Sequence, residues 1–195
     1  MCGRFTLYNK KKVADKIGFN INPSYNIAPS QSILILTPKP ILFYWGLSPT
    51  WAKKPMNLIN ARIETLKEKP AFKKTKPCIV VSNGWYEWKK SNNSEKIPFF
   101  IHDGNKIIYF AGIYNEIGCS IITKEASPSL ANIHHRQPLI LGKKERLCWI
   151  REFEINHPDE QKKLQCHRVG NYVNSPKNND PKCCLLYTSP SPRDK

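Results

Sequence analysis

Sixteen prolines among 195 residues restrict this chain to short helices and strands. Proline removes a backbone donor and breaks the interior of a helix or a sheet. Hydrophobic residues still make up 40% of the chain and aromatic residues 11%, so there are enough apolar side chains for one sizeable core. We therefore expect a single domain of short elements and not a bundle of long helices.

Apolar runs between turn residues indicate where the strands lie. They predict strands at residues 33–36, 41–45, 78–81, 98–101, 107–112 and 120–123. Asn9 before residues 10–17 and Gly18 after them are typical of a short capped helix. Composition predicts further helices at 61–68, 127–133 and 143–151. The expected fold class is α+β, with a curved or barrel-like antiparallel sheet flanked by short helices.

The end of the chain has a different composition. Residues 185–195, LLYTSPSPRDK, are rich in serine and proline and show no apolar period. This string is also similar to translated sequencing-adapter read-through. We expect a folded domain at 2–181 and a disordered or artefactual tail at 182–195.

The chain carries a large excess of positive charge. Lys and Arg total 31 against 15 Asp and Glu, a formal net charge of +16. A solvated lysine-rich surface is one interpretation, but an excess of this size favours a polyanionic partner, and nucleic acid is the first candidate. The apolar runs are too short to cross a bilayer and no signal-peptide pattern is present, so we expect no membrane association. The expected location is intracellular: the cytoplasm in a bacterium or the nucleus in a eukaryote.

Seven cysteines, an odd number without a CxxC pair, argue against a disulfide framework and a zinc ribbon. His134 and His135 have no third metal ligand at a suitable spacing, so we predict neither a metal nor a cofactor. Cys2 differs from the other cysteines because it directly follows Met1. A small second residue normally allows removal of the initiator methionine, and this would leave Cys2 with a free α-amine beside its thiol.

One carboxylate lies in the aromatic segment NGWYEWKK at 83–90. If folding removes Glu87 from water between Trp85 and Trp88, its pKa rises and it can donate a proton near neutral pH. The alternative is a half-exposed strand glutamate paired with Lys89.

Tryptophans close to lysines are typical of platforms on which unpaired bases stack. Trp45 and Trp51 flank a Ser-Pro turn in WGLSPTW, and Trp88 lies directly before two lysines. Packing in the core is the alternative interpretation for these side chains.

Three polar residues alternate in LINARIET, at positions 60, 62 and 64. In a strand-to-helix junction Asn60, Arg62 and Glu64 could face one side together. An ordinary helix start with Asn60 as its N-cap is an equally good interpretation of the same letters.

Seven blocks, in the same order along the chain, resemble those of the SOS-response-associated peptidase family, whose members are abasic-site processing proteins. They are MCGRF at 1–5, YNIAPSQ at 25–31, WGLSPTW at 45–51, NARIET at 60–65, NGWYEW at 83–88, IITKEA at 121–126 and IHHRQP at 133–138. The late segment VGNYVNSPKNNDP at 169–181 extends the resemblance to nearly all of the expected domain.

The resemblance implies roles for individual residues. The processed Cys2 traps the ring-opened aldehyde of an abasic site, Asn60 positions the sugar, and Glu87 protonates its ring oxygen and relays protons. His134 matches the catalytic histidine, while His135 is the variable residue between it and the arginine. The residues matched to contacts with the DNA backbone or bases are Arg4, Trp45, Arg62, Trp88 and the phosphate-contacting Arg136.

The function that the resemblance implies is an abasic-site sensor in DNA damage repair and the SOS response. Such a protein forms a covalent thiazolidine crosslink through Cys2 to single-stranded DNA and acts as a monomer at forks or junctions. The resemblance also implies that it processes its own N-terminus and allows a lyase step. One alternative is a cysteine peptidase with Cys2 as nucleophile, His134 as base and Glu87 as orienter. A second alternative is a noncatalytic binder of single-stranded or modified DNA. Mutation of Cys2 separates these hypotheses, because noncovalent binding should survive it.

Overall fold

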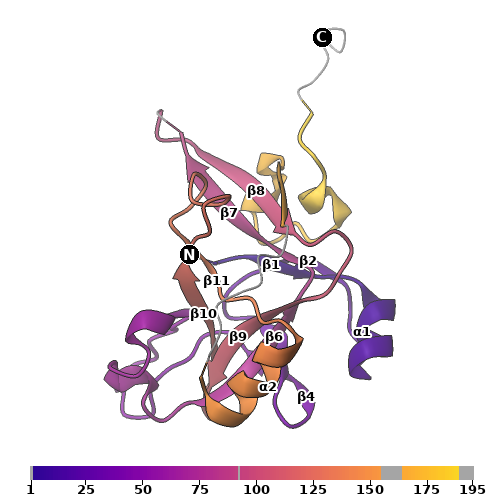
Figure 1. Cartoon of the computed structure of the whole chain (residues 1–195). Helices are drawn as coiled ribbons and strands as arrows, with labels where there is room; N and C mark the ends of the chain where they lie inside the picture. The colour runs from indigo at the N-terminus through magenta and orange to yellow at the C-terminus, as the bar shows by residue number, and fades with distance from the viewer. Residues whose placement is uncertain (1, 92, 155–163, 189–195) are drawn as a thin grey trace, which may run out of the picture.

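The computed structural model describes residues 2–91, 93–154 and 164–188, which form short strands, two α-helices and four 3-10 turns (Figure 1). The strands are β1 (Phe5–Leu7), β2 (Ser24–Ile27), β3 (Ser32–Leu36), β4 (Pro40–Tyr44), β5 (Asn60–Arg62), β6 (Lys76–Ser82), β7 (Gly84–Lys90), β8 (Lys96–His102), β9 (Ile108–Tyr114), β10 (Cys119–Glu125), β11 (Arg136–Pro138) and β12 (Gln165–Arg168). The helices are α1 (Lys10–Ile17) and α2 (Lys143–Glu152), and the 3-10 turns are η1 (Ile63–Thr65), η2 (Pro70–Phe72), η3 (Asn171–Asn174) and η4 (Pro181–Cys184).

The strands form two sheets. One has the order β12-β8-β7-β1-β2, and the other has the order β11-β10-β9-β6-β3-β4, with β5 added beside β10. Every pair of named strands is antiparallel except β5 with β10, which is parallel. The predicted α+β fold is confirmed, and the sheets are curved without closing into a barrel.

The six strands predicted from apolar runs all form, as β3, β4, β6, β8, β9 and β10. No apolar run predicted β1, β2, β5, β11 or β12. Each of these has only three or four residues, too few for a period of alternation to stand out. Long-range pairing defines them instead.

Two predicted helices are confirmed and two are wrong. The Asn9 side chain accepts the Lys12 N–H at 3.1 Å, and Gly18 ends α1 with a φ of 71°. Helix α2 extends one residue beyond its predicted end. Residues 61–68 instead continue β5 into η1, because β5 pairs with β10, and residues 127–133 form turns. No helix in the described ranges is long and apolar enough to span a membrane.

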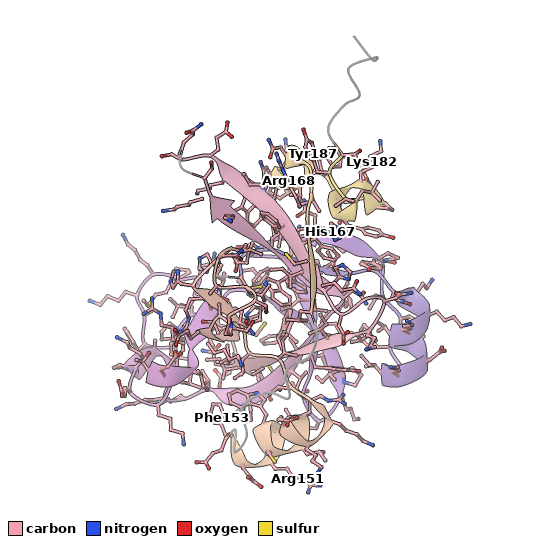
Figure 2. All side chains as sticks on the ribbon, turned by 45° about the horizontal axis from the view of Figure 1, so that its top comes forward. Arg151, Phe153, His167, Arg168, Lys182 and Tyr187 are labelled. Carbon is pink, nitrogen blue, oxygen red and sulfur yellow. The ribbon has the colours of Figure 1, made fainter. Side chains whose placement is uncertain are left out.

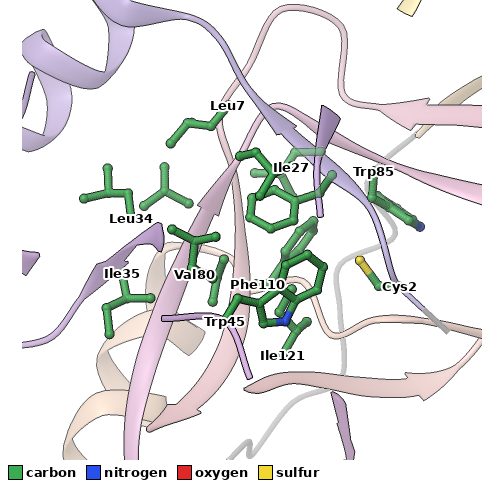
Figure 3. Close-up of a cluster of buried hydrophobic side chains, with 14 of the residues drawn as sticks. Cys2, Leu7, Ile27, Leu34, Ile35, Trp45, Val80, Trp85, Phe110 and Ile121 are labelled. Carbon is green, nitrogen blue, oxygen red and sulfur yellow. The ribbon is translucent and has the colours of Figure 1, made fainter. Parts of the chain in front are cut away.

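The main core lies between the two sheets. Phe5 of β1 packs edge-on against Trp45 and Phe110, with ring centroids 5.1 and 6.3 Å apart, and Trp85 packs edge-on against Phe110. Cys2 belongs to this cluster of buried side chains and lies beside Trp85 at its edge (Figure 3). Cys2 is therefore held by the core itself.

The C-terminal segment packs against the five-stranded sheet. Tyr187 donates its backbone N–H to the carbonyl of Arg168 at 2.9 Å, and the Arg168 guanidinium lies 4.4 Å from the Tyr187 ring centroid (Figure 2). Cys183 in η4 is buried. Residues 182–187 therefore differ from the expected disordered tail, whereas residues 189–195 lie outside the described part of the chain.

Candidate active site

Cys2 is tied to β5 by a hydrogen bond. Asn60 Nδ2 donates to the backbone carbonyl oxygen of Cys2 at 2.8 Å. Asn60 begins β5 and pairs with Ile121 of β10, so its position is set by the seven-stranded sheet. It is a strand residue and not a helix N-cap, which leaves its side-chain amide available for the N-terminal segment.

The second polar atom of the same side chain has a different environment. Asn60 Oδ1 is buried, and no described residue donates a hydrogen bond to it. A buried acceptor without a donor costs free energy of about 1–3 kcal/mol. A bound hydroxyl group could satisfy this atom, and this is consistent with a site that receives a sugar.

Glu87 lies on β7 and is only 3% exposed. Burial raises its pKa from 4.5 to about 7, so that a large fraction of the carboxyl groups carries a proton at neutral pH. The pKa of the Cys2 thiol is raised mainly by burial and further by the nearby charge of Glu87. The carboxyl and the thiol are therefore neighbours, and a half-exposed glutamate paired with Lys89 is the wrong interpretation.

His134 lies just before β11, and its ring has a defined orientation. Its Nδ1 accepts the backbone N–H of Arg136 at 2.9 Å, which places the proton of the neutral ring on Nε2. Burial lowers the pKa of His134 below its ordinary value, so the ring is mainly neutral at pH 7. The described residues contain no group of three metal-ligating side chains, and the His134–His135 pair is part of no such group.

Glu87 and His134 face the same cavity. It has a volume of about 450 Å³ and is lined by Arg4, Glu87, Trp88, Lys90, Lys96, His134 and Asn174. A second cavity of about 450 Å³ is lined by residues that include the end of β1 and parts of β2 and β3. None of the predicted site residues lines it. The two cavities have the same volume. Only the first is lined by an acid, an imidazole and several cationic side chains.

Arg4 and Trp88 line the first cavity and are held there by residues of β2 and η3. Arg4 donates to Asn26 Oδ1 at 2.8 Å and to the carbonyl of Val173 at 3.0 Å, and its guanidinium lies 5.8 Å from the Trp88 ring centroid. Trp88 Nε1 donates to Asn174 Oδ1 at 2.8 Å. Both predicted DNA contacts thus lie together beside Glu87.

The two remaining arginines have different surroundings. Arg62 is exposed on β5, two residues after Asn60. The Arg136 side chain is only 10% exposed, and it donates to both carboxylate oxygens of Glu64, at 2.7 and 2.8 Å. It also donates to the carbonyl of Thr123 at 2.7 Å. The sequence predicts that Arg136 contacts a phosphate, but in the structure its guanidinium already has a carboxylate partner.

The structure contradicts the prediction that Trp45 stacks on bases. Trp45 is fully buried, and its Nε1 donates to the carbonyl of Ile59 at 2.9 Å. Trp51 of the same motif is instead 62% exposed and lies close in sequence to Lys53 and Lys54. The signal that could have identified Trp51 was its position between a Ser-Pro turn and two lysines.

Comparison with known proteins gives consistent results over most of the chain. A family model described as SOS response associated peptidase (SRAP) matches residues 1–176. The abasic site processing protein YoqW of Bacillus subtilis is 34% identical over 220 residues, covering 93% of this chain and 97% of that protein. YedK of Escherichia coli, also an abasic site processing protein, is 33% identical over 78% of this chain and 80% of its own length.

A solved structure also shares the fold. The crystal structure of a protein from Bacteroides thetaiotaomicron superimposes with a TM-score of 0.79 at 25% identity, covering 96% of this chain and all of that chain. A phage-related protein from Bordetella bronchiseptica has a TM-score of 0.67 at 22% identity, over 86% of this chain and 94% of its own.

Proposed function

The chain belongs to the SOS response associated peptidase family, and from this membership we propose that it processes abasic sites in DNA. The reaction we propose is covalent capture of the lesion by Cys2 once Met1 has been removed. The observation that carries the proposal is the hydrogen bond from Asn60 to the Cys2 carbonyl, because it holds the N-terminal cysteine beside the buried acid Glu87.

The proposed chemistry requires an N-terminal cysteine. Its α-amine attacks the aldehyde of the ring-opened sugar and forms an imine with loss of one water. The thiol then adds across the C=N bond, its proton passes to the nitrogen, and a five-membered thiazolidine ring closes. Near pH 7.4 roughly a quarter of an ordinary α-amine is unprotonated, against about one in a thousand for a lysine. Only an N-terminal cysteine offers such an amine and a thiol on adjacent carbons.

Three side chains support the steps before and after the attack. An abasic sugar is mainly a closed hemiacetal, so its ring must open first. Glu87, with a pKa of about 7, is suited to donate a proton to the ring oxygen and to take one back later. The neutral His134 presents Nε2–H as a donor in the same cavity. Asn60 Oδ1 is the buried acceptor for a sugar hydroxyl.

The DNA partner is proposed from charge and exposed aromatic side chains. A formal net charge of +16 favours a polyanion. Arg4 and Trp88 line the cavity, and Arg62 is exposed on β5. We assign the stacking role to the exposed Trp51 in place of Trp45. Stacking requires unpaired bases, so we propose single strands or junctions with single strands as the substrate.

Two further parts of the proposal concern related reactions. Exposure of Cys2 by self-processing is one, and a lyase step through the imine is another. A peptidase reaction with Cys2, His134 and Glu87 is the competing hypothesis. In the described structure the Cys2 thiol has a raised pKa, which opposes thiolate attack, whereas an uncharged thiol is no obstacle to ring closure on an imine. This favours lesion capture.

The test is to mix the protein with a single-stranded oligonucleotide that carries one abasic site and to separate the products on a denaturing gel. We expect a band that retains protein and DNA after heating in detergent. The matched control is the tetrahydrofuran analogue, which has the same shape but cannot open to an aldehyde, and it should give no such band. Equal retention of both oligonucleotides, or of neither, contradicts the proposal.

A further inference from the structure

Glu64 and Arg136 form an ion pair that crosses one strand of the seven-stranded sheet. Arg136 Nη1 and Nη2 donate to Glu64 Oε1 and Oε2 at 2.7 and 2.8 Å, a bidentate arrangement. Arg136 Nη2 also donates to the carbonyl of Thr123 on β10 at 2.7 Å. Glu64 follows β5 and Arg136 begins β11, so the contact joins the two strands that flank β10.

Both ends of this ion pair lead to the candidate active site. On one side, β5 carries Asn60, which holds the Cys2 carbonyl. On the other side, the backbone N–H of Arg136 holds Nδ1 of His134 and so sets which ring nitrogen carries the proton. An ion pair that restrains β5 relative to β11 therefore restrains the strand that holds Cys2 relative to the strand that holds the imidazole.

We propose that Glu64 is a positioning residue for abasic-site capture, an assignment that rests on the proposed function above. Its carboxylate anchors Arg136, and through the Arg136 main chain it orients His134 in the cavity that Glu87 also lines. Glu64 touches no reacting atom in this role. The role also explains why Arg136 is largely buried although it belongs to a DNA-binding block of the sequence.

A second ion pair in the same protein shows what distinguishes this one. Lys67 and Glu154 approach to 3.0 Å, but the contact has one N–O distance and both side chains are mostly exposed. Exposed pairs of this kind contribute little. Glu64 is 47% exposed, but its partner is only 10% exposed and is also bonded to the backbone of β10. Loss of Glu64 would leave a buried guanidinium without its carboxylate.

The test compares Glu64→Gln with Glu154→Gln, which removes a carboxylate from the exposed pair. Both are mixed in excess with the abasic oligonucleotide, and the rate of crosslinking is followed against protein concentration. We expect Glu64→Gln to lower the limiting first-order rate by about 10- to 100-fold, because small misplacements of reacting groups have effects of this size. The half-saturating protein concentration should stay within about twofold, and Glu154→Gln should match the parent.

A double-mutant cycle tests whether Glu64 acts through Arg136. The two single variants Glu64→Gln and Arg136→Gln and the double variant are compared in limiting rate. If the pair acts as one unit, the double variant should be no slower than the slower single variant. Multiplicative losses would overturn the assignment.

Binding of an undamaged single strand separates positioning from phosphate contact. If Glu64 only restrains a phosphate-binding arginine, Glu64→Gln should bind DNA more tightly, with a logarithmic salt slope steeper by about 0.7. The positioning role predicts unchanged affinity and slope. Tighter binding with a parental crosslinking rate overturns it.

The parent protein separates failure of this inference from failure of the proposed function. If the parent forms no crosslink, the proposed function is wrong. If the parent crosslinks and Glu64→Gln keeps its limiting rate, the proposed function stands and the role of Glu64 is refuted. Should Glu64→Gln not fold, Glu64→Asp is measured in its place. It keeps the charge but shortens the side chain, so a limiting rate equal to that of the parent would refute the role.

Discussion

The side-chain amide of Asn60 holds the backbone carbonyl of Cys2 at 2.8 Å, although 58 positions separate them in the sequence. This contact places the N-terminus of the chain next to a sheet that also supports His134, with Glu87 on the opposing sheet. The proposed function assigns each residue a separate step in the capture of an aldehyde, and these assignments can be measured one at a time.

The first prediction concerns the N-terminus of the mature protein. Ring closure needs a free α-amine on Cys2, so Met1 must be absent from protein that crosslinks. Intact-mass measurement should give a value lower than the encoded chain by one methionine. A preparation that retains Met1 in full and still forms the heat-stable product would rule out the thiazolidine mechanism.

The pH dependence of crosslinking should be bell-shaped and should depend on Glu87. Above pH 7 the Glu87 carboxyl loses the proton it must donate, and below the α-amine pKa of about 7.7–8.0 the nucleophile becomes protonated. Glu87→Gln should lower the rate by about 10²–10⁴-fold and remove the decrease at high pH. Rates measured from pH 5.5 to 9 test this, and an unchanged high-pH limb in Glu87→Gln would assign that limb to another group.

The same carboxyl should make the protein less stable at high pH. Its folded-state pKa is raised from 4.5 to about 7, so the folded state holds more protons than the unfolded state between these values. Stability therefore falls as pH rises through this window, by roughly 3 kcal/mol in total, and the penalty stays constant above it.

Glu87→Gln removes the group that titrates. The variant should be more stable than the parent by up to roughly 3 kcal/mol at pH 8, with the difference much smaller at pH 5. Urea unfolding of the parent and the variant at pH 8 and at pH 5 measures the two stability differences. A variant that is less stable than the parent at pH 8 would show that the charged carboxylate is well solvated in the folded protein.

Trp51 and Trp45 should separate DNA binding from folding. Trp51→Ala removes an exposed ring and should weaken binding of single-stranded DNA by roughly 1–3 kcal/mol with little change in stability. Trp45→Ala removes a buried ring and its bond to Ile59, and it should destabilise the fold by about 3–5 kcal/mol. Fluorescence anisotropy with a labelled strand and urea unfolding provide the two measurements. If Trp51→Ala binds DNA with the affinity of the parent, Trp51 is not part of the binding surface.

The elements whose structure depends on residues close in sequence were predictable. Asn9 and Gly18 mark the ends of α1 by local capping, and the apolar runs mark the longer strands. The segment from Ala61 was not predictable in this way. It has helical composition, but pairing with β10 makes its start a strand. Tertiary pairing outweighs a propensity difference of a few tenths of a kcal/mol per residue.

The candidate site shows the same limit. Family-like motifs indicate Cys2, Asn60, Glu87 and His134, and the structure places Glu87 near Cys2 and Asn60 against it. The motif WGLSPTW contains two tryptophans that look alike in sequence, and only packing tells the buried one from the exposed one. The ion pair of Glu64 with Arg136 joins residues 72 positions apart, which no local pattern reveals.

Covalent capture by Cys2 is tested most simply by a crosslinking time course with Cys2→Ala, Cys2→Ser and the parent on one abasic single strand. Samples are heated in detergent and separated on a denaturing gel. The account predicts a heat-stable product for the parent, none for Cys2→Ala, and at most a weak adduct for Cys2→Ser, since a hydroxyl closes the second ring poorly. A heat-stable product that forms with Cys2→Ala at the parental rate would contradict capture by Cys2 and would assign the covalent bond to another amine, such as that of a lysine.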